Sequence, residues 1–473
     1  MTETHATKAP FHLVVAGGGS AAFAAATTAL DAGARVTIVN ECLPMGGTCV
    51  NVGCVPSKAL LRAAAAVAAA RRCPFAGIRT TAEVVSTAAV LDQVRALVAD
   101  LRKAKYADVV KGRPGFRYVA GRARIVGPTA VEAVGERIEG DAVLIATGVR
   151  AHVPDVPGAA EALPLTNDTF FDEPSLPASA VIVGASFVGL ELAQALARLG
   201  TKVTVVEAAE RILPREAADV SDALRCALAE DGVAFVTGTT LARVRRDGRG
   251  VVVTARRRGA TLEVAADRWI AATGRVPNVE GLGLEAVGVA TDERGFVVVD
   301  AHQRTSVPTI FAAGDVAGGA MFVYTAARAG MLAAENAMGG KVARPDDPVP
   351  WVLFTDPQVA GIGLDLQEAR AAGLDAAAAT VPLTHVPRAI AARDARGFVR
   401  LVQDRATGRL VGARIVAPEG GELVMEVATA MAAGRTVADL RAALHPYLTL
   451  SEAIKLAAIA FETDPANLSC CAG

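Results

Sequence analysis

Two pairs of cysteines, far apart in the chain, have the residue type and spacing needed for redox or soft-metal chemistry. Cys49 and Cys54 lie within the sequence GGTCVNVGCVPSK at residues 46–58. Cys470 and Cys471 are adjacent, within the final residues SCCAG. Thiolates act as nucleophiles, as partners in disulfide exchange and as ligands for soft metals. The two pairs therefore predict chemistry that takes place at sulfur.

The sequence around the first pair favours a redox function over a structural disulfide. Pro56 fixes the start of a helix that we expect to run through Ala70, which places Cys54 at or just before its N-terminus. The helix dipole stabilises a thiolate there and lowers the pKa of the cysteine. A Cys49–Cys54 disulfide would close a loop of only about six residues, which stabilises a fold by roughly 2 kcal/mol at most. Redox chemistry is the better explanation for this pair.

The second pair has the properties of a soft-metal ligand on a short tether. Adjacent cysteines form a disulfide only in a strained small ring, so a structural bridge is not expected. Two thiolates suit a soft ion such as Hg(II). The tether from Glu452 to the pair is short enough to hold the thiols near a site at an effective concentration on the order of mM.

Two glycine-rich turns predict two nucleotide-binding units that would position these cysteines. Gly17-x-Gly19-x-x-Ala22 follows an apolar run at 11–16 and precedes a strand at 36–39 that leads to Glu41. Gly17 permits the tight turn, Gly19 lets the backbone approach a pyrophosphate, and Ala22 allows close packing of helix on strand. The acidic residue is placed to accept a ribose hydroxyl.

The same order of elements returns later in the chain. Gly184-x-Ser186-x-x-Gly189 follows a strand at 180–183 and precedes a strand at 203–206, which leads to Glu207. A carboxylate at that place accepts the ribose 2′-OH of NADH and repels the 2′-phosphate of NADPH. Arg211, one turn further on, could instead pair with a phosphate. The choice between NADH and NADPH stays open, with a lean towards NADH.

Composition narrows the class of protein further. The 473 residues have a formal net charge of −1, which leaves no broad basic surface for nucleic acid. Seven cysteines, an odd number, suit the cytoplasm better than a secreted disulfide framework. We recognise neither a targeting segment nor an unbroken run of 18 apolar residues, so we expect no membrane association.

Several segments together resemble the pyridine nucleotide–disulfide oxidoreductases. Residues 46–58 resemble their redox-active disulfide segment, and TSVPTIFAAGD at 305–315 resembles their second flavin segment. The tripeptide Ala-Thr-Gly recurs at 146–148 and 272–274. A cysteine pair near the C-terminus is what mercuric reductases add to this pattern. The resemblance covers essentially the whole chain, and it implies a catalytic core without the extra N-terminal metal-binding domain that many members carry.

The resemblance implies an α/β fold with two Rossmann-like dinucleotide-binding domains of the glutathione-reductase type and an α+β C-terminal dimerisation domain. Pro-rich segments at 153–164 and 345–350 mark the expected domain boundaries. We expect, in chain order, 1–150 as the first part of the FAD-binding domain, 151–275 as the NAD(P)H-binding domain, 276–347 as the second FAD-binding part, and 348–473 as the interface domain with its Cys-Cys tail. In the last of these we expect strands at about 379–416 and helices at about 420–435 and 451–461.

The resemblance also assigns cofactor roles to individual residues. FAD would be bound by Gly17, Gly19, Ala22, Glu41, Gly47, Thr48, Thr147, Gly148, Gly314 and Asp315, the last on the ribityl chain. The nicotinamide nucleotide, NADPH in most mercuric reductases, would be bound by Gly184, Ser186, Gly189, Glu207, Arg211 and Gly274.

The same resemblance implies the catalytic roles around the redox pair. Cys54 would be the sulfur next to the flavin, and Cys49 the interchange sulfur that faces the substrate. Lys58 would lie near flavin N5, with Glu191 as its ion-pair partner.

The segment from His445 to Glu452 combines features of two groups of relatives. Disulfide reductases carry His-Pro-Thr-x-x-Glu, in which the glutamate orients an imidazole that shuttles protons. Mercuric reductases resemble this segment with a two-residue insertion that includes a tyrosine, here Tyr447, and commonly lose the histidine. His445 is therefore either a proton shuttle or a remnant whose spacing no longer supports that task. A second metal-site tyrosine, expected before Thr166, is absent from the sequence.

The resemblance implies that the chain reduces Hg(II), which arrives as a thiol complex, to Hg(0). The metal ligands would be Cys49, Cys54, Cys470 and Cys471, with the terminal pair serving the active site of the partner subunit in a homodimer. One alternative is a disulfide reductase like thioredoxin reductase or dihydrolipoamide dehydrogenase. The other is a non-catalytic buffer that sequesters a metal on its thiols.

Overall fold

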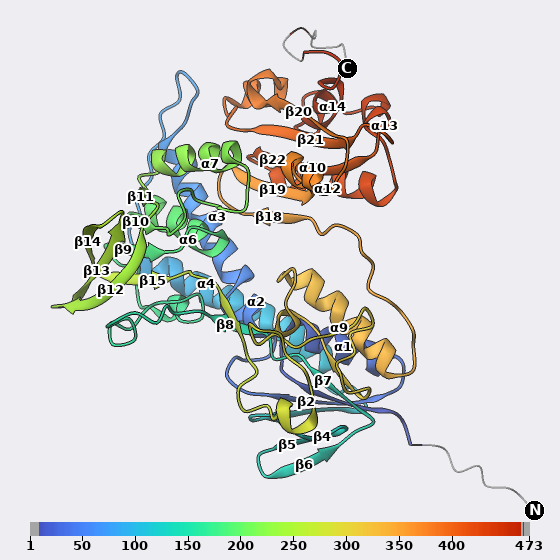
Figure 1. The fold of residues 1–473 in the computed structure, drawn as a ribbon. Coiled ribbons are helices and arrows are strands. Elements are labelled where there is room, and N and C mark those ends of the chain that lie inside the picture. The colour runs from blue at the N-terminus through green and yellow to red at the C-terminus, as the bar shows by residue number, and fades with distance from the viewer. Residues whose placement is uncertain (1–8, 465–466, 468–473) are drawn as a thin grey trace, which may run out of the picture.

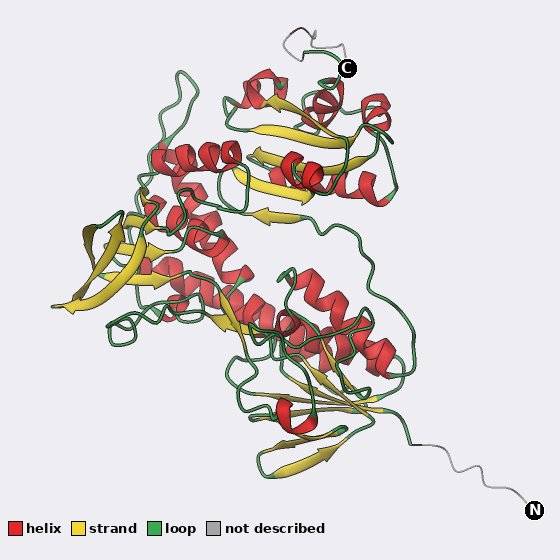
Figure 2. Ribbon diagram, viewed as in Figure 1, coloured by secondary structure: helices red, strands yellow, loops and turns green. Residues whose placement is uncertain are grey.

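A computed structural model describes residues 9–464 and residue 467 of the chain. Three α/β units follow one another in space, with the C-terminal unit at the top right of Figure 1 and the N-terminal unit at the bottom. In each unit the helices gather against a sheet (Figure 2). This architecture confirms the fold class expected from the sequence.

The first unit is built on a parallel five-stranded sheet in the order β17-β7-β1-β2-β3. Its strands are β1 (His12–Ala16), β2 (Arg35–Asn40), β3 (Phe116–Ala120), β7 (Ala142–Ile145) and β17 (Ile310–Ala312). All five residues of β1 are buried, because helices α1 (Ser20–Asp31) and α9 (Val323–Ala337) cover one face of the sheet and a small antiparallel sheet covers the other. That small sheet consists of β4 (Arg124–Gly127), β5 (Ala130–Ala133) and β6 (Glu136–Glu139).

The strand β17 shows that the chain returns to the first unit after the second one is complete. Ile310–Ala312 pairs in parallel with Val143–Ile145. The crossover between the units includes the short pair β8 (Val149–Ala151) and β16 (Arg275–Pro277). The second flavin-like segment, 305–315, is therefore placed beside the first glycine motif.

The second unit repeats this design with a four-stranded parallel sheet in the order β11-β10-β9-β15. Its strands are β9 (Ser179–Val183), β10 (Lys202–Val206), β11 (Ala234–Val236) and β15 (Arg268–Ala271). Alternate residues of β9 pack on opposite layers. Ala180 and Ile182 contact the helical side, with α6 (Phe187–Arg198) and α7 (Ala218–Glu230), and Val181 and Val183 contact a hairpin sheet. The hairpin sheet consists of β12 (Thr240–Asp247), β13 (Gly250–Arg257) and β14 (Ala260–Ala266).

A run of helices joins the first two units. It comprises α2 (Gly47–Asn51), α3 (Cys54–Arg71), α4 (Thr87–Arg102), a π-helical turn (Lys103–Ala107) and α5 (Asp108–Val110). By length and composition alone the segment Gly47–Arg71 could cross a membrane, which the sequence analysis did not anticipate. In the fold, Leu60 and Ala64 of this segment are fully buried in the core that α3 shares with α6, and 28% of its most apolar window is buried.

The third unit is an antiparallel sheet in the order β18-β19-β22-β21-β20, with helices packed on it. Its strands are β18 (Trp351–Leu353), β19 (Gln358–Gly363), β20 (Ala376–Pro382), β21 (Phe398–Asp404) and β22 (Leu410–Ala417). Its helices are α10 (Leu366–Ala371), α11 (Pro387–Ala392), α12 (Gly420–Ala432), α13 (Val437–Ala442) and α14 (Glu452–Ile459). The sequence pattern predicted β20 to β22, α12 and α14 but missed β18 and β19, which are short and carry no turn signal of their own.

Candidate active site

The two glycine-rich turns adopt backbone geometry that only glycine tolerates. Gly17 has a φ of +121°, and a Cβ atom there would lie 2.1 Å from the carbonyl oxygen of Ala146. Gly184 has a φ of +107°, and a Cβ atom would lie 2.3 Å from the carbonyl oxygen of Ala272. Each turn is therefore pressed against the later Ala-Thr-Gly tripeptide of its own unit. This contact explains why the two sequence patterns occur together.

The helix starts that follow these turns fit the pyrophosphate groups of two dinucleotides. Gly19 is the N-cap residue of α1 and Ser186 is the N-cap residue of α6, and neither helix start is capped by a hydrogen bond from a side chain. The backbone N–H groups of the first turn therefore remain available to an anion, with the helix dipole in the favourable direction. Ala22, in the first turn of α1, is fully buried, as close packing of helix on strand requires.

The first glycine turn also positions the redox pair. The N–H of Gly46 donates to the carbonyl oxygen of Gly18 at 2.8 Å, and a Cβ atom on Gly47 would lie 2.7 Å from the Cα atom of Gly19. The segment that carries Thr48 and Cys49 thus packs backbone to backbone on the dinucleotide turn. A side chain at Gly47 would separate the cysteines from that turn.

Asn51 fixes the short helix α2, which carries Cys49. Its buried Nδ2 atom donates to the carbonyl oxygens of Pro44, Met45 and Gly47 at 3.1, 3.2 and 2.8 Å. Its Oδ1 atom accepts from Arg102 Nη1 at 3.2 Å. The sequence analysis missed this residue, because an asparagine inside a short helix gives no signal until its partners are known.

Cys54 is the first residue of α3, as the position of Pro56 predicted. The hydrogen bond from Cys49 lowers the pKa of Cys54 to about 6, and Lys58 acts in the same direction. Burial and the negative charge of Glu191 oppose this shift. The hydrogen bond to Cys54 and burial raise the pKa of Cys49. The reduced pair is thus a Cys54 thiolate that accepts a hydrogen bond from a Cys49 thiol.

Lys58 and Glu191 form an ion pair across the junction of the two nucleotide-binding units. Lys58 Nζ lies 2.7 Å from Glu191 Oε2, and the glutamate side chain is only 6% exposed. The other oxygen, Oε1, accepts the backbone N–H of Phe354 at 3.0 Å. The sequence resemblance named the two partners, but it gave no role to Phe354.

A cavity of about 430 Å³ brings the redox pair and the expected flavin-binding residues together. Its lining includes Gly19, Thr48, Cys49, Cys54, Lys58, Gly148, Glu191, Gly314 and Asp315. Asp315 forms an ion pair with Arg275 at 3.2 Å, and burial raises the pKa of its carboxyl group. Glycine backbone, an uncapped helix start and a carboxylate at the end of the second flavin-like segment suit FAD.

Five of the residues expected to bind FAD lie outside this lining, namely Gly17, Ala22, Glu41, Gly47 and Thr147. The Thr147 hydroxyl donates to the carbonyl oxygen of Asn278 at 2.7 Å, so it serves the crossover between the units. Glu41 follows β2 and is exposed. Their roles as cofactor ligands stay predictions.

The cavity also contains a tyrosine that the sequence analysis did not find. Tyr324, from α9, lines the cavity, and its hydroxyl donates to the carbonyl oxygen of Pro350. Burial raises the pKa of this phenol to about 12, and the negative charge of Cys54 adds to the effect. The sequence analysis did not find Tyr324 because it belongs to a segment far from both cysteine pairs in the sequence.

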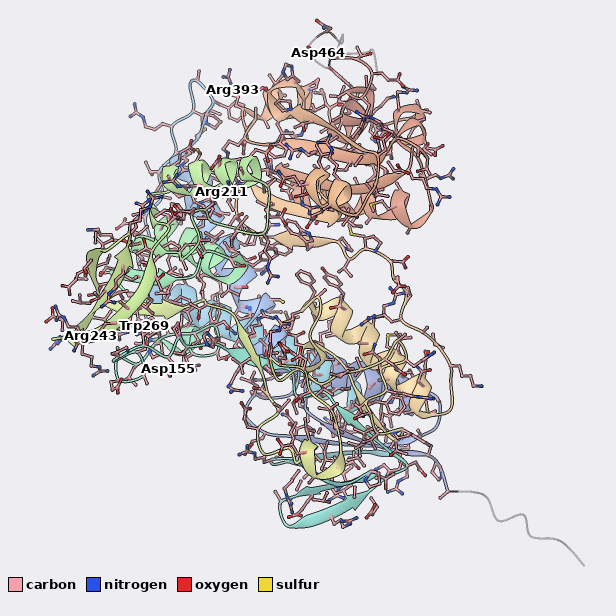
Figure 3. All side chains as sticks on the ribbon, viewed as in Figure 1. Asp155, Arg211, Arg243, Trp269, Arg393 and Asp464 are labelled. Carbon is pink, nitrogen blue, oxygen red and sulfur yellow. The ribbon has the colours of Figure 1, made fainter. Side chains whose placement is uncertain are left out.

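In the second unit, Glu207 is held by two backbone groups. Its Oε2 atom accepts the N–H of Ala185 at 2.6 Å, and its Oε1 atom accepts the N–H of Ala209 at 2.8 Å. The carboxylate is thus fixed beside the second glycine turn. Arg211 is exposed, on the segment that leads to α7 (Figure 3). Gly189 packs with its Cα against Gly184, since a Cβ atom would lie 2.0 Å from the Gly184 oxygen.

The expected orientation of His445 by Glu452 is wrong within the chain. His445 Nε2 pairs with Glu426 Oε1 of α12 at 2.7 Å, and the imidazole is 6% exposed. Glu452, at the start of α14, turns back to accept the N–H of Leu448 at 2.8 Å. The longer loop with Tyr447 gives the glutamate a backbone donor closer than the imidazole. None of His445, Tyr447 and Glu452 lines the redox cavity of its own chain.

The terminal thiols Cys470 and Cys471 lie outside the described residues. Within residues 9–464 and 467, no group of three or more His, Cys, Asp or Glu side chains is arranged to hold a metal ion.

Comparisons with known proteins agree with this geometry. Residues 11–330 match the family described as pyridine nucleotide-disulphide oxidoreductase, and residues 349–458 match its dimerisation domain. A mercuric reductase of Streptomyces lividans is 41% identical over 470 residues, which is 98% of each chain. A mercuric reductase of Shigella flexneri is 42% identical over 473 residues, 98% of this chain and 83% of that protein.

Two solved structures share the fold over almost the whole chain. The HOCl-induced flavoprotein disulfide reductase RclA of Escherichia coli superposes with a TM-score of 0.85 at 28% identity, covering 95% of this chain and 99% of that one. LpdA of Mycobacterium tuberculosis superposes with a TM-score of 0.84 at 31% identity, covering 96% and 100%.

Proposed function

The chain belongs to the pyridine nucleotide–disulphide oxidoreductases, and from this we propose that it reduces Hg(II) to Hg(0) with electrons from a nicotinamide cofactor. One observation supports this most directly. A Cys54 thiolate at a helix start faces a cavity that fits FAD, in a chain that is 41% identical to a mercuric reductase over 98% of each chain.

The cofactors of this family are FAD and NAD(P)H. FAD, when bound, supplies the relay that takes a hydride from the nicotinamide and passes two electrons to sulfur or metal. The chain's own residues prepare the sulfur. Lys58 stabilises the Cys54 thiolate, Glu191 holds Lys58 in place, and Asn51 keeps Cys49 beside Cys54.

The overall reaction balances as a two-electron transfer. A thiol complex Hg(SR)₂, one NAD(P)H and one proton give Hg(0), NAD(P)⁺ and two thiols. Cys49 and Cys54 are proposed as the ligands that hold Hg(II) during reduction, since two soft thiolates match a soft ion. The metal is released because Hg(0) no longer carries the charge that thiolates bind.

Cys470 and Cys471 are proposed to capture Hg(II) and pass it to Cys49 and Cys54 by ligand exchange. We further propose that they serve the active site of the partner subunit. The match to the dimerisation domain implies a homodimer, and the described part of the third unit reaches the redox cavity of its own chain only through Val352 and Phe354. We propose a cytoplasmic location, because seven cysteines, an odd number, do not suit a secreted disulfide framework.

NADH is proposed as the better nicotinamide cofactor. The anchored carboxylate of Glu207 supports this choice, since a fixed negative charge disfavours a 2′-phosphate. A disulfide reductase activity is the second candidate, supported by the His445–Glu426 pair, which would make a competent proton shuttle if the partner subunit's redox pair lay beside it.

The test is the oxidation of NADH and NADPH by the FAD-loaded dimer with Hg(II) in excess thiol, with volatile mercury trapped and measured. Hg(II)-dependent oxidation with one Hg(0) released per NAD(P)H supports the proposal. The variants Cys49→Ser and Cys54→Ser should lose this activity while they retain FAD. A protein that turns over lipoyl or protein disulfides but releases no Hg(0) would instead be a disulfide reductase.

A further inference from the structure

The segment between β18 and β19 lies along a buried polar side of α6. Glu191, Gln194 and Arg198 are spaced three and four residues apart, so they lie on one side of the helix. They are 5%, 0% and 6% exposed. Buried polar groups of this kind need partners, and the partners come from residues 354–356.

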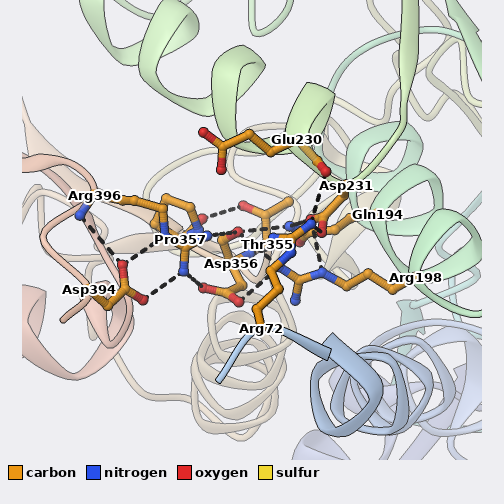
Figure 4. A network of polar contacts seen from close by, with 10 residues as sticks. All are labelled: Arg72, Gln194, Arg198, Glu230, Asp231, Thr355, Asp356, Pro357, Asp394 and Arg396. Atoms are coloured by element: carbon orange, nitrogen blue, oxygen red, sulfur yellow. Dashed lines mark hydrogen bonds and ion pairs between the residues drawn. The ribbon is translucent and has the colours of Figure 1, made fainter. Parts of the chain in front are cut away.

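These contacts fix the backbone of the segment. Glu191 Oε1 accepts the N–H of Phe354 at 3.0 Å. Gln194 accepts the N–H of Asp356 at 2.7 Å and donates to its carbonyl oxygen at 2.7 Å. Arg198 Nη2 reaches the Asp356 carboxylate at 2.9 Å. One helix face therefore holds Phe354 and Asp356 by main chain and side chain together. Figure 4 shows the part of this face formed by Gln194 and Arg198 on Asp356.

A second group of charges holds the same segment from the other side. Arg396, in the loop after α11, contacts Asp356 Oδ1 at 2.8 Å and is held in turn by Asp394 at 2.6 Å. Arg198 is also bound by the buried carboxylate of Asp231 at 2.8 Å. Asp356 thus joins the second nucleotide-binding unit to the third unit (Figure 4).

The fixed segment places an aromatic ring against the redox lysine. Lys58 Nζ lies 4.8 Å from the centroid of the Phe354 ring, within the range of a cation–π contact. Glu191 binds the same ammonium group through Oε2 and the Phe354 backbone through Oε1. Ring and carboxylate are therefore fixed relative to each other, and the ammonium group is held between them.

We propose that Phe354 is a positioning residue that holds the Lys58 ammonium group beside Cys54 and thereby links the dimerisation domain to the redox pair. Phe354 lies within the part of the chain that matches the dimerisation domain. The charged groups around Cys54 are Lys58, Glu191 and Arg275, and Cys49 donates a hydrogen bond to it. A lysine free to leave this arrangement would stabilise the thiolate less.

This proposal deepens the proposed function, but its test needs neither Hg(II) nor a nicotinamide. The rate of alkylation of Cys54 by iodoacetamide is measured against pH in the reduced, FAD-loaded dimer that carries Cys49→Ser. Tandem mass spectrometry separates Cys54 from Cys42 on the same peptide. The serine hydroxyl can still donate a hydrogen bond to the thiolate, so the midpoint reports on the remaining charges.

In that background Phe354→Leu should move the Cys54 midpoint upward by about half a pH unit, the size expected for loss of one partly exposed cation–π contact. Phe354→Tyr keeps the aromatic face and should leave the midpoint unchanged. Phe354 is 39% exposed, so neither change threatens the fold. Gln194→Ala loosens the segment without touching the ring or Lys58, and it should shift the midpoint in the same direction.

A control is available on β21, where Arg400 lies 5.1 Å from the ring centroid of Phe398. Phe398 is buried in the core, so Phe398→Leu removes a cation–π contact together with core packing, and it should still leave the Cys54 midpoint unchanged. The proposal is overturned if Phe354→Leu titrates like the parent protein. It is also overturned if Phe398→Leu produces the same shift, because the effect would then be general loosening. If the protein without substitutions reduces no Hg(II), but Phe354→Leu still shifts the Cys54 midpoint as expected, the result counts against the proposed function alone.

Discussion

Lys58 Nζ lies 2.7 Å from Glu191 Oε2, so one ion pair joins the helix that starts at Cys54 to a helix of the second nucleotide-binding unit. The two residues are 133 positions apart in the sequence. The charge that stabilises the thiolate is therefore provided by one unit and held in place by another. This arrangement makes the chemistry of Cys54 sensitive to how the units pack.

The first prediction concerns the pH dependence of Cys54. The pKa of about 6 means that its thiolate fraction, and hence its alkylation rate, should fall as the pH drops through about 6. Lys58→Met removes a positive charge and should raise this midpoint, whereas Glu191→Gln removes a negative charge and should lower it. Alkylation profiles of the reduced protein measure both. Shifts of the same sign would contradict the electrostatic account.

The second prediction concerns the nicotinamide cofactor. Glu207→Gln should lower kcat/KM for NADH about tenfold or more, the usual effect of losing a charged hydrogen-bond partner, and should harm NADPH less. Steady-state kinetics with both nucleotides give the ratio. Arg211→Ala is the matched control. If it reduces NADPH use more strongly than Glu207→Gln reduces NADH use, the exposed arginine decides the preference.

The third prediction concerns the terminal thiols. A Cys470→Ala/Cys471→Ala double variant should lose Hg(II) turnover by at least about tenfold in millimolar competing thiol, because tethered ligands no longer compete with the free ones. In low thiol the loss should be much smaller. Unchanged turnover at high thiol would remove the tail from the mechanism. A mixed dimer, with Cys49→Ser in one subunit and the double variant in the other, tests whether the tail serves its partner.

The fourth prediction concerns stability. Asp231 is almost fully buried and binds Arg198 at 2.8 Å, so Asp231→Ala removes one of the two carboxylates that pair with this buried guanidinium, the other being Asp356. We expect a loss of about 3–5 kcal/mol in the free energy of unfolding. Asp92→Ala breaks the exposed pair with Arg95 and should cost about 0–1 kcal/mol. Urea unfolding measures the free energy of unfolding of both variants. Equal losses would mean that the buried ion pair contributes no more to stability than the exposed one.

The fifth prediction concerns His445. We expect His445→Ala to reduce Hg(II)-dependent NADH oxidation far less than the ~100-fold loss that follows removal of a general acid–base catalyst. The imidazole is hydrogen-bonded to Glu426. Ligand exchange at mercury only moves protons from the incoming thiols to the leaving thiolates, so it needs no separate proton shuttle. Activity assays with Hg(II) and with a lipoyl disulfide answer the question. A loss confined to the disulfide assay would show that the shuttle survives for that substrate.

The match between sequence and structure is best where local geometry controls the outcome. The positive φ of Gly17 and Gly184, the helix start at Cys54 and the uncapped starts of α1 and α6 follow from a few neighbouring residues. The sequence did not predict the hydrogen-bond partner of Glu452, the N–H of Leu448, because that contact depends on the conformation of a loop. It also failed to find Tyr324, which reaches the cavity from α9.

The sequence by itself determined that this is a two-nucleotide flavoprotein fold with chemistry at cysteine pairs, because glycine turns, helix starts and cysteine spacing act over a few residues. The tertiary structure alone decided which distant groups control those cysteines. Phe354 contacts Lys58, and Asp356 bridges two units, only once α3, α6 and the third unit have packed. Contacts between segments more than a hundred residues apart depend on that packing, which no local pattern specifies.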